Sequence, residues 1–175
     1  TLLKAMDSMA QHMPERLRME HMLLRANAQN KAWEFFTSDS TGKTLTKYYD
    51  RKGTPNERML AHYIKGCAYR DMGDEPMALQ CFNEAAAAAD TADTQCDFYQ
   101  LSIIHSQMAR FFKRRALANE ALEAYGMAEH YAWKAQDSLR VLNIWSNKAE
   151  CLIDKRLFYE GPKLYEKTAK KYREI

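Results

Sequence analysis

Residues 66–85 read GCAYRDMGDEPMALQCFNEA, and this stretch decides the fold. It alternates small and bulky residues at fixed steps from Gly66, with Tyr69, Ala78, Phe82 and Ala85 lying 3, 12, 16 and 19 residues further on. Gly73 in its middle favours the left-handed conformation that ends a helix, and Pro76 is tolerated in the first turn of the next one. The stretch therefore predicts two antiparallel helices joined by a tight turn.

The same steps occur twice more along the chain. Counting from Ala109 gives Phe112, Ala121, Tyr125 and Ala128, and counting from Ala149 gives Leu152, Gly161, Tyr165 and Thr168. The copies begin 43 and 40 residues apart. Small residues let two helices approach closely, and bulky residues fill the space between one hairpin and the next. The repetition predicts an all-α fold made of stacked helical hairpins.

This pattern resembles the tetratricopeptide repeat, a helical hairpin with small and aromatic residues at set positions. The first copy resembles it nearly completely, the second has Ala116 where the family prefers a turn glycine, and the third is degenerate around Gly161 and Pro162. The resemblance implies a right-handed superhelical array of antiparallel helical hairpins, a TPR-like α-solenoid. We expect a single domain over residues 1–175, as a fragment of a longer protein. Its expected parts are a diverged hairpin region 1–52, repeats 54–92 and 94–135, and a degenerate repeat or cap at 137–175.

Capping signals and apolar spacing predict the individual helices. Thr54 and Glu57 fit a capping box, with Pro55 at the first helical position. Gly53 and Gly73 are both predicted to end helices in the left-handed conformation. No strand pattern is present, and residues 37–42 are predicted to form a polar loop. The predicted helices are 2–12, 15–35, 43–52, 56–72, 75–89, 95–114, 118–135, 138–154 and 158–173.

Composition excludes several classes of protein. The 175 residues are 46% hydrophobic and 28% charged, which suffices for an ordinary core without a disulfide or metal. No apolar run approaches the roughly 20 residues that span a membrane. A net charge of +3 is too weak for a dedicated nucleic-acid binder. We therefore expect no membrane insertion and no nucleic-acid binding by this segment.

Catalytic and metal-binding motifs are missing from the sequence. The four cysteines form no C-x-x-C pair and are expected to be small buried residues inside helices. The five histidines form no i, i+4 pair, and His105 falls on a packing stripe. No P-loop, G-x-S-x-G or dinucleotide glycine motif occurs. We expect a chain that is not an enzyme and holds no cofactor and no metal.

The resemblance also implies where a ligand would bind, because the first helix of each tetratricopeptide hairpin lines a concave groove. Asparagine and glutamine can hydrogen-bond a peptide backbone, and basic side chains attract carboxylates. The chain lacks the lysine–asparagine carboxylate clamp of chaperone-binding members. The candidate groove residues are Tyr63, Arg70, Gln107, Arg110, Lys113, Arg114, Asn143 and Asn147.

Two functions follow from the resemblance, and both involve binding. The first is a non-catalytic protein–protein or peptide interaction module, the sensing or scaffolding part of a larger bacterial protein. The second is a peptide-pheromone-type receptor domain of a transcriptional regulator, in which a short signalling peptide changes the curvature of the array. In either case the expected partner is a protein or peptide with acidic character. The compartment stays open; we expect a soluble segment, and a membrane-anchored bacterial protein is one kind of protein that could contain it.

Overall fold

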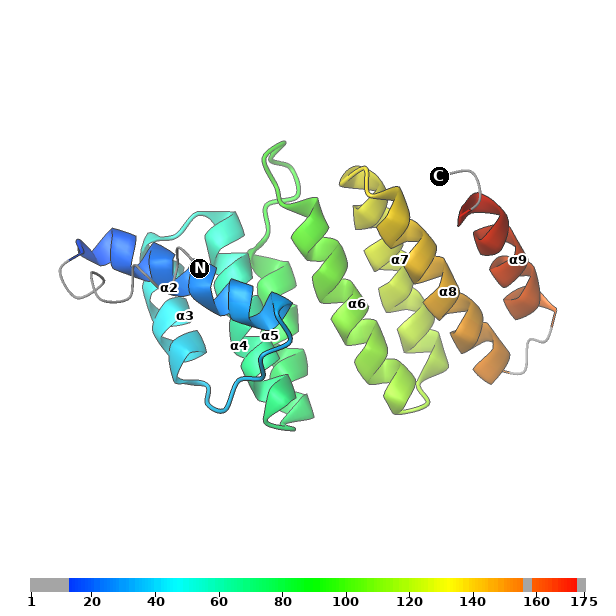
Figure 1. Cartoon of the computed structure of the whole chain (residues 1–175), viewed down its shortest axis with the longest axis horizontal. Coiled ribbons are helices and arrows are strands. Elements are labelled where there is room, and N and C mark those ends of the chain that lie inside the picture. Colours follow the sequence, from blue (N-terminus) through cyan, green and yellow to red (C-terminus); the bar gives the residue numbers. More distant parts are fainter. Residues whose placement is uncertain (1–12, 156–158, 173–175) are drawn as a thin grey trace. The chain divides into compact units, whose positions relative to one another are not determined.

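The computed structural model describes residues 13–155 and 159–172, and this part of the chain is all-helical (Figure 1). Helices cover 80% of it, and it contains no strand, so the all-α prediction is confirmed. The predicted helix 2–12 lies outside the described residues. The helices are α2 (Glu15–Lys31), α3 (Ser40–Lys52), α4 (Pro55–Asp71), α5 (Glu75–Ala88), α6 (Phe98–Arg114), α7 (Ala118–Lys134), α8 (Ser138–Asp154) and α9 (Glu160–Tyr172).

The chain divides into two compact units, unit 1 over Thr1–Asp90 and unit 2 over Thr91–Ile175. In unit 1, α4 packs against α5 and α3, and α2 packs against both α3 and α4. In unit 2, α6 packs on α7, α7 on α8, and α8 on α9. Packing of neighbouring helices in this way is consistent with a helical repeat.

Side-chain caps begin four of the helices in the described part of the chain, α4, α5, α6 and α8. The capping box of α4 is confirmed, since Thr54 Oγ1 accepts from the Glu57 amide and Glu57 Oε2 accepts from the Thr54 amide at 2.9 Å. Asp97 accepts a hydrogen bond from the Gln100 amide at 2.9 Å. This cap places the start of α6 at Phe98, three residues later than predicted.

Two predictions about α2 and α3 were wrong at their ends. Helix α2 ends at Lys31 and not at residue 35, because Trp33 turns into the left-handed region with φ 59° and Phe36 is drawn into the core. Helix α3 begins at Ser40, inside the predicted loop 37–42. The carboxylate of Asp39 anchors this earlier start, because it pairs with Lys43 and accepts from the Tyr69 hydroxyl, both at 2.7 Å.

The two glycines predicted to end helices behave differently. Gly73 has φ +81°, so the predicted left-handed turn after α4 is confirmed. Gly53 has φ −90° and ψ 154°, which is extended backbone, so the left-handed prediction was wrong there. Only Gly53 and Thr54 separate α3 from α4, and the N-cap at Thr54 keeps this short connection extended.

The small and bulky positions of the repeat pack as the spacing indicated. Ala78 and Ala121 are fully buried, and so is Phe82. A Cβ atom on Gly66 would lie 2.6 Å from Cε1 of Phe82, so only glycine fits there without a shift. The four cysteines are free and buried, as expected of small core residues. No helix in the described part is both long and apolar enough to cross a membrane.

Candidate functional site

The predicted groove residues belong to different units. Tyr63 and Arg70 lie on α4 in unit 1, and the other six lie on α6 and α8 in unit 2. The eight residues are therefore described as two separate surfaces, one on α4 of unit 1 and one on α6 and α8 of unit 2.

On α4, Tyr63 and Arg70 are both held by one side chain of α2. Tyr63 is only 3% exposed, and its hydroxyl oxygen lies 3.2 Å from Nδ2 of Asn30, which donates to it. Arg70 donates to Oδ1 of the same Asn30 at 3.1 Å. Burial raises the pKa of Tyr63, so its hydroxyl stays neutral. The structure thus brings Tyr63 and Arg70 together, under a helix of the same chain.

The segment after α2 closes this face further. Arg70 also forms an ion pair with Asp71 at 2.8 Å, and the Asp71 side chain is 3% exposed. The second Asp71 oxygen accepts a hydrogen bond from the Phe36 amide at 3.0 Å. At its other end, α2 is fixed by the Arg16–Glu57 ion pair. A ligand can reach Tyr63 only after α2 moves away.

In unit 2, α6 and α8 run parallel and are joined at both ends. Near their starts, the Arg140 guanidinium lies 4.4 Å from the centroid of the Tyr99 ring. Near their ends, Lys113 of α6 forms an ion pair with Glu150 of α8. The two helices therefore present one surface made from both, which we call the α6–α8 face.

The basic residues of the α6–α8 face have different surroundings. Arg110 is exposed and forms no ion pair among the described residues. Lys113 is neutralised by Glu150, and Arg114 packs its guanidinium 4.6 Å from the centroid of the Phe111 ring. Gln107 is half-buried one turn before Arg110. The three cations follow one another on α6, and of these three Arg110 has neither an ion pair nor a ring contact in the described part of the chain.

The two asparagines of α8 are linked to each other. Asn147 Nδ2 donates to the main-chain oxygen of Asn143 at 2.7 Å. The Tyr172 hydroxyl of α9 donates to Oδ1 of Asn143, also at 2.7 Å. These bonds orient both amides, and within the described residues they leave Nδ2 of Asn143 and Oδ1 of Asn147 without a partner. An extended backbone can use such a donor and acceptor.

A buried hydroxyl lies within the electrostatic reach of Arg110 and Lys113. Tyr125 is 1% exposed, and its hydroxyl has no hydrogen-bond partner among the described residues. Burial raises the pKa of Tyr125, and Arg110 and Lys113 act on it in the opposite direction. The sequence indicated this ring as a packing residue but not its hydroxyl. The available signal was a tyrosine where the first copy has Phe82.

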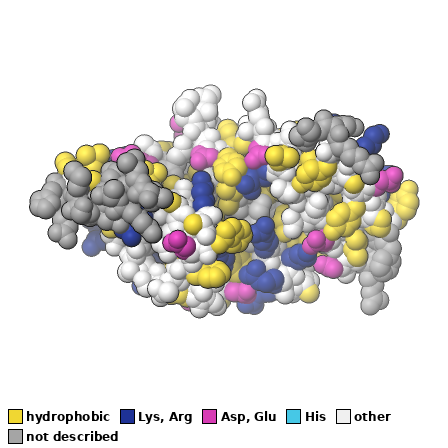
Figure 2. Space-filling view, viewed as in Figure 1, with side chains coloured by type: hydrophobic (Ala, Val, Ile, Leu, Met, Phe, Trp, Pro, Cys, Tyr) yellow, Lys and Arg dark blue, Asp and Glu magenta, His cyan; other side chains and the backbone are white. Residues whose placement is uncertain are grey.

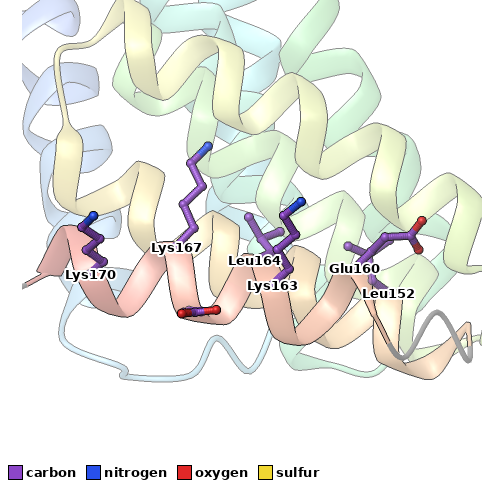
Figure 3. A pocket seen from close by; sticks show the side chains of 7 residues that line it. Leu152, Glu160, Lys163, Leu164, Lys167 and Lys170 are labelled. Carbon is purple, nitrogen blue, oxygen red and sulfur yellow. The ribbon is translucent and has the colours of Figure 1, made fainter.

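A second concave surface lies along α9 (Figure 3). Its volume is about 590 Å³, with Leu152 and Leu164 as apolar lining and Lys163, Lys167 and Lys170 extending from α9. The ammonium group of Lys167 lies 4.1 Å from the centroid of the Trp145 ring, so this lysine is partly engaged. The sequence predicted a degenerate repeat or cap over residues 137–175 and did not indicate this hollow.

No arrangement for metal chemistry occurs in the described part of the chain, where no three His, Cys, Asp or Glu side chains gather to hold an ion. On the face shown in Figure 2, basic side chains lie among acidic and hydrophobic ones.

No protein-family model matches the chain, and no curated protein gives a significant sequence match. The surfaces of the two units are therefore what indicates a function.

Proposed function

We propose that this chain is a tetratricopeptide-type superhelical array and a non-catalytic module that binds a protein or peptide on its α6–α8 face. Three repeat copies and the packing of successive helices support the array. The observation that carries the binding proposal is the exposed Arg110 on a surface shared with the oriented amides of Asn143 and Asn147. The module is the sensing or scaffolding part of a larger bacterial protein.

The face suits an extended acidic segment. Arg110 offers a charge-assisted hydrogen bond to a carboxylate, and the Asn143 and Asn147 amides offer a donor and an acceptor to a peptide backbone. Each hydrogen bond to a charged group contributes about 1.5–3 kcal/mol when sheltered and less when exposed. Several modest interactions of this kind give an affinity suited to a reversible module.

A second candidate function is a receptor for a short signalling peptide, in a transcriptional regulator. The observation that favours it is the cover over α4, where Asn30 occupies Tyr63 and Arg70. A peptide that replaced Asn30 would have to displace α2, and binding would then change the shape of unit 1. In this case Arg70 and Tyr63 would contact the peptide.

The binding proposal is tested with the double variant Arg110→Ala/Asn147→Ala. Pull-down from the native cell extract should lose the partners that the unchanged chain captures, and Tm should stay nearly the same. Arg25→Ala/Asn83→Ala is the matched control, because it removes the same two residue types from exposed positions of unit 1. Recovery of the same partners by Arg110→Ala/Asn147→Ala would place the binding surface elsewhere.

A further inference from the structure

A separate hollow in unit 1 is lined mostly by basic side chains. It lies between α2 and α3 and has a volume of about 310 Å³. Four cations but only one carboxylate line it. The lining residues are Glu15, Arg18, Met19, Thr44, Lys47, Tyr48, Arg51 and Lys52.

The single carboxylate, that of Glu15, forms an ion pair with one of the four cations, Lys52. Glu15 pairs with Lys52 at 2.6 Å, and the hydrogen bond and charge of Lys52 lower the pKa of Glu15. The ammonium of Lys52 also lies 5.3 Å from the centroid of the Tyr48 ring. Arg18, Lys47 and Arg51 are left around the hollow without an ion pair in the described part of the chain.

Three other cations of unit 1 do have carboxylate partners. Ion pairs link Arg16 to Glu57, Lys43 to Asp39, and Arg70 to Asp71. Like charges that gather on one concave surface repel one another, and that cost is offset when an anion binds between them. The contrast between paired and unpaired cations indicates an anion site.

The buried positions of α3 determine which of its residues line the hollow. Leu45 and Tyr49 are fully buried, which leaves the other side of α3 to Lys47 and Arg51, one turn apart. Arg18 comes from α2, next to Met19, whose side chain is buried. Two helices therefore supply the cations, and the buried residues beside them fix the backbone positions from which the cationic side chains extend.

We propose that the α2–α3 hollow binds a phosphate group, carried either by a small molecule or by a phosphorylated protein side chain. Two guanidinium forks and one ammonium match the several oxygens of a phosphate dianion, whereas a carboxylate fills a single fork. The volume is near the lower end of ligand pockets, about 300 Å³, and suits one such group with its immediate substituent. The site lies in a different unit from the α6–α8 face, so it goes beyond the proposed function.

The test titrates the whole chain with inorganic phosphate by isothermal calorimetry, at constant ionic strength kept with chloride. Lys47→Gln/Arg51→Gln removes two exposed cations of the hollow. Its matched control is Arg25→Gln/Lys31→Gln, which removes one exposed arginine and one exposed lysine from α2 of the same unit. Phosphate binding should weaken roughly tenfold or more in the first variant and stay unchanged in the control. Circular dichroism and Tm verify that both variants fold, and Arg18→Gln tests the same site from α2.

Two further titrations identify the source of the phosphate. A phosphoserine peptide that binds more tightly than inorganic phosphate, while its serine counterpart does not bind, supports a phosphorylated side chain. Tighter binding of inorganic phosphate supports a small phosphorylated molecule. Equal weakening in the two double variants, or no heat beyond that of chloride, overturns the proposal, because either result reduces the effect to general charge attraction or to none.

Discussion

On α4 of unit 1, Tyr63 and Arg70 are occupied by Asn30, whereas on α6 of unit 2, Arg110 is exposed and unpaired within the described residues. Both helices carry the same repeat pattern, so the pattern does not determine which face is open. The difference comes from the neighbouring helix: α2 inserts an amide between the two polar groups of α4, and α8 meets α6 through Tyr99–Arg140 and Lys113–Glu150. A repeat fixes which residues face a neighbour, and the neighbour decides whether a ligand can reach them.

The largest expected effect tests whether the large aromatic residue of the repeat contributes equally to stability in the two units. Phe82→Ala in unit 1 and Tyr125→Ala in unit 2 remove almost fully buried rings from equivalent positions. Each should lower the free energy of unfolding by about 3–5 kcal/mol, because the cavity adds to the lost burial. Urea unfolding measures both. A loss below about 1 kcal/mol at either position would mean that the two rings are not equivalent.

The next prediction breaks the comparison directly. Asn30→Ala leaves polar groups of Tyr63 and Arg70 without their partner, so it should cost about 1–3 kcal/mol. Asn147→Ala removes a side chain on the α6–α8 face that bonds within its own helix, and should cost about 0.5 kcal/mol or less. Thermal and urea unfolding of both variants give the difference. Equal costs would show that the α4 face is not specially closed by Asn30.

A pH series sharpens the account of unit 2. Burial lowers the pKa of His105 below its ordinary value of 6.5, so the folded state favours the neutral ring that stacks on Tyr131. The unfolded chain takes up a proton first as pH falls, and stability is therefore lost below about pH 7 until the folded pKa is passed. His105→Phe should keep the stacking and remove this part of the acid sensitivity. Unfolding measured from pH 7.5 to 5, with His130→Phe as the control ring, contradicts the assignment if both variants retain the full pH slope.

The smallest effect concerns the turns of the two units. The turn after α4 has Gly73 at φ +81°, while the turn after α6 has Ala116 at φ 57°, a conformation unfavourable for alanine. Ala116→Gly should stabilise the chain by about 0.5–1 kcal/mol, after the greater entropy of glycine in the unfolded state is counted. Gly73→Ala should destabilise it by a similar amount. Differential scanning calorimetry resolves both shifts, and the same sign for both would contradict this reading of the turns.

Much of the helical framework could be predicted from local signals. The capping box at Thr54 and the glycine at Gly73 mark the ends of α4 because each acts within a few residues of its own position. The same reasoning failed at Gly53, where the short connection to the next helix decides the backbone. Local chemistry therefore predicts helices well and short connections less well.

The candidate site was less predictable because it depends on contacts between distant residues. Asn30 was not a candidate, and its bonds to Tyr63 and Arg70 span 33 and 40 residues of sequence. No local pattern indicates that α2 crosses α4 at this point. The Tyr125 hydroxyl was likewise missed, because spacing identifies a buried ring without showing whether its polar atom has a partner.

The central claim is that partners contact the α6–α8 face of unit 2 and not the α4 face of unit 1, which α2 covers. A photo-crosslinking amino acid at Ile103 of α6, and in a second variant at Leu60 of α4, tests it at positions 43 residues apart that are equivalent in the repeat. Both residues are half-buried, so the two probes perturb similar surroundings. After irradiation in native cell extract, the account predicts partner adducts from position 103 that Arg110→Ala/Asn147→Ala abolishes, and none from position 60. Adducts from position 60 with none from position 103 would contradict it.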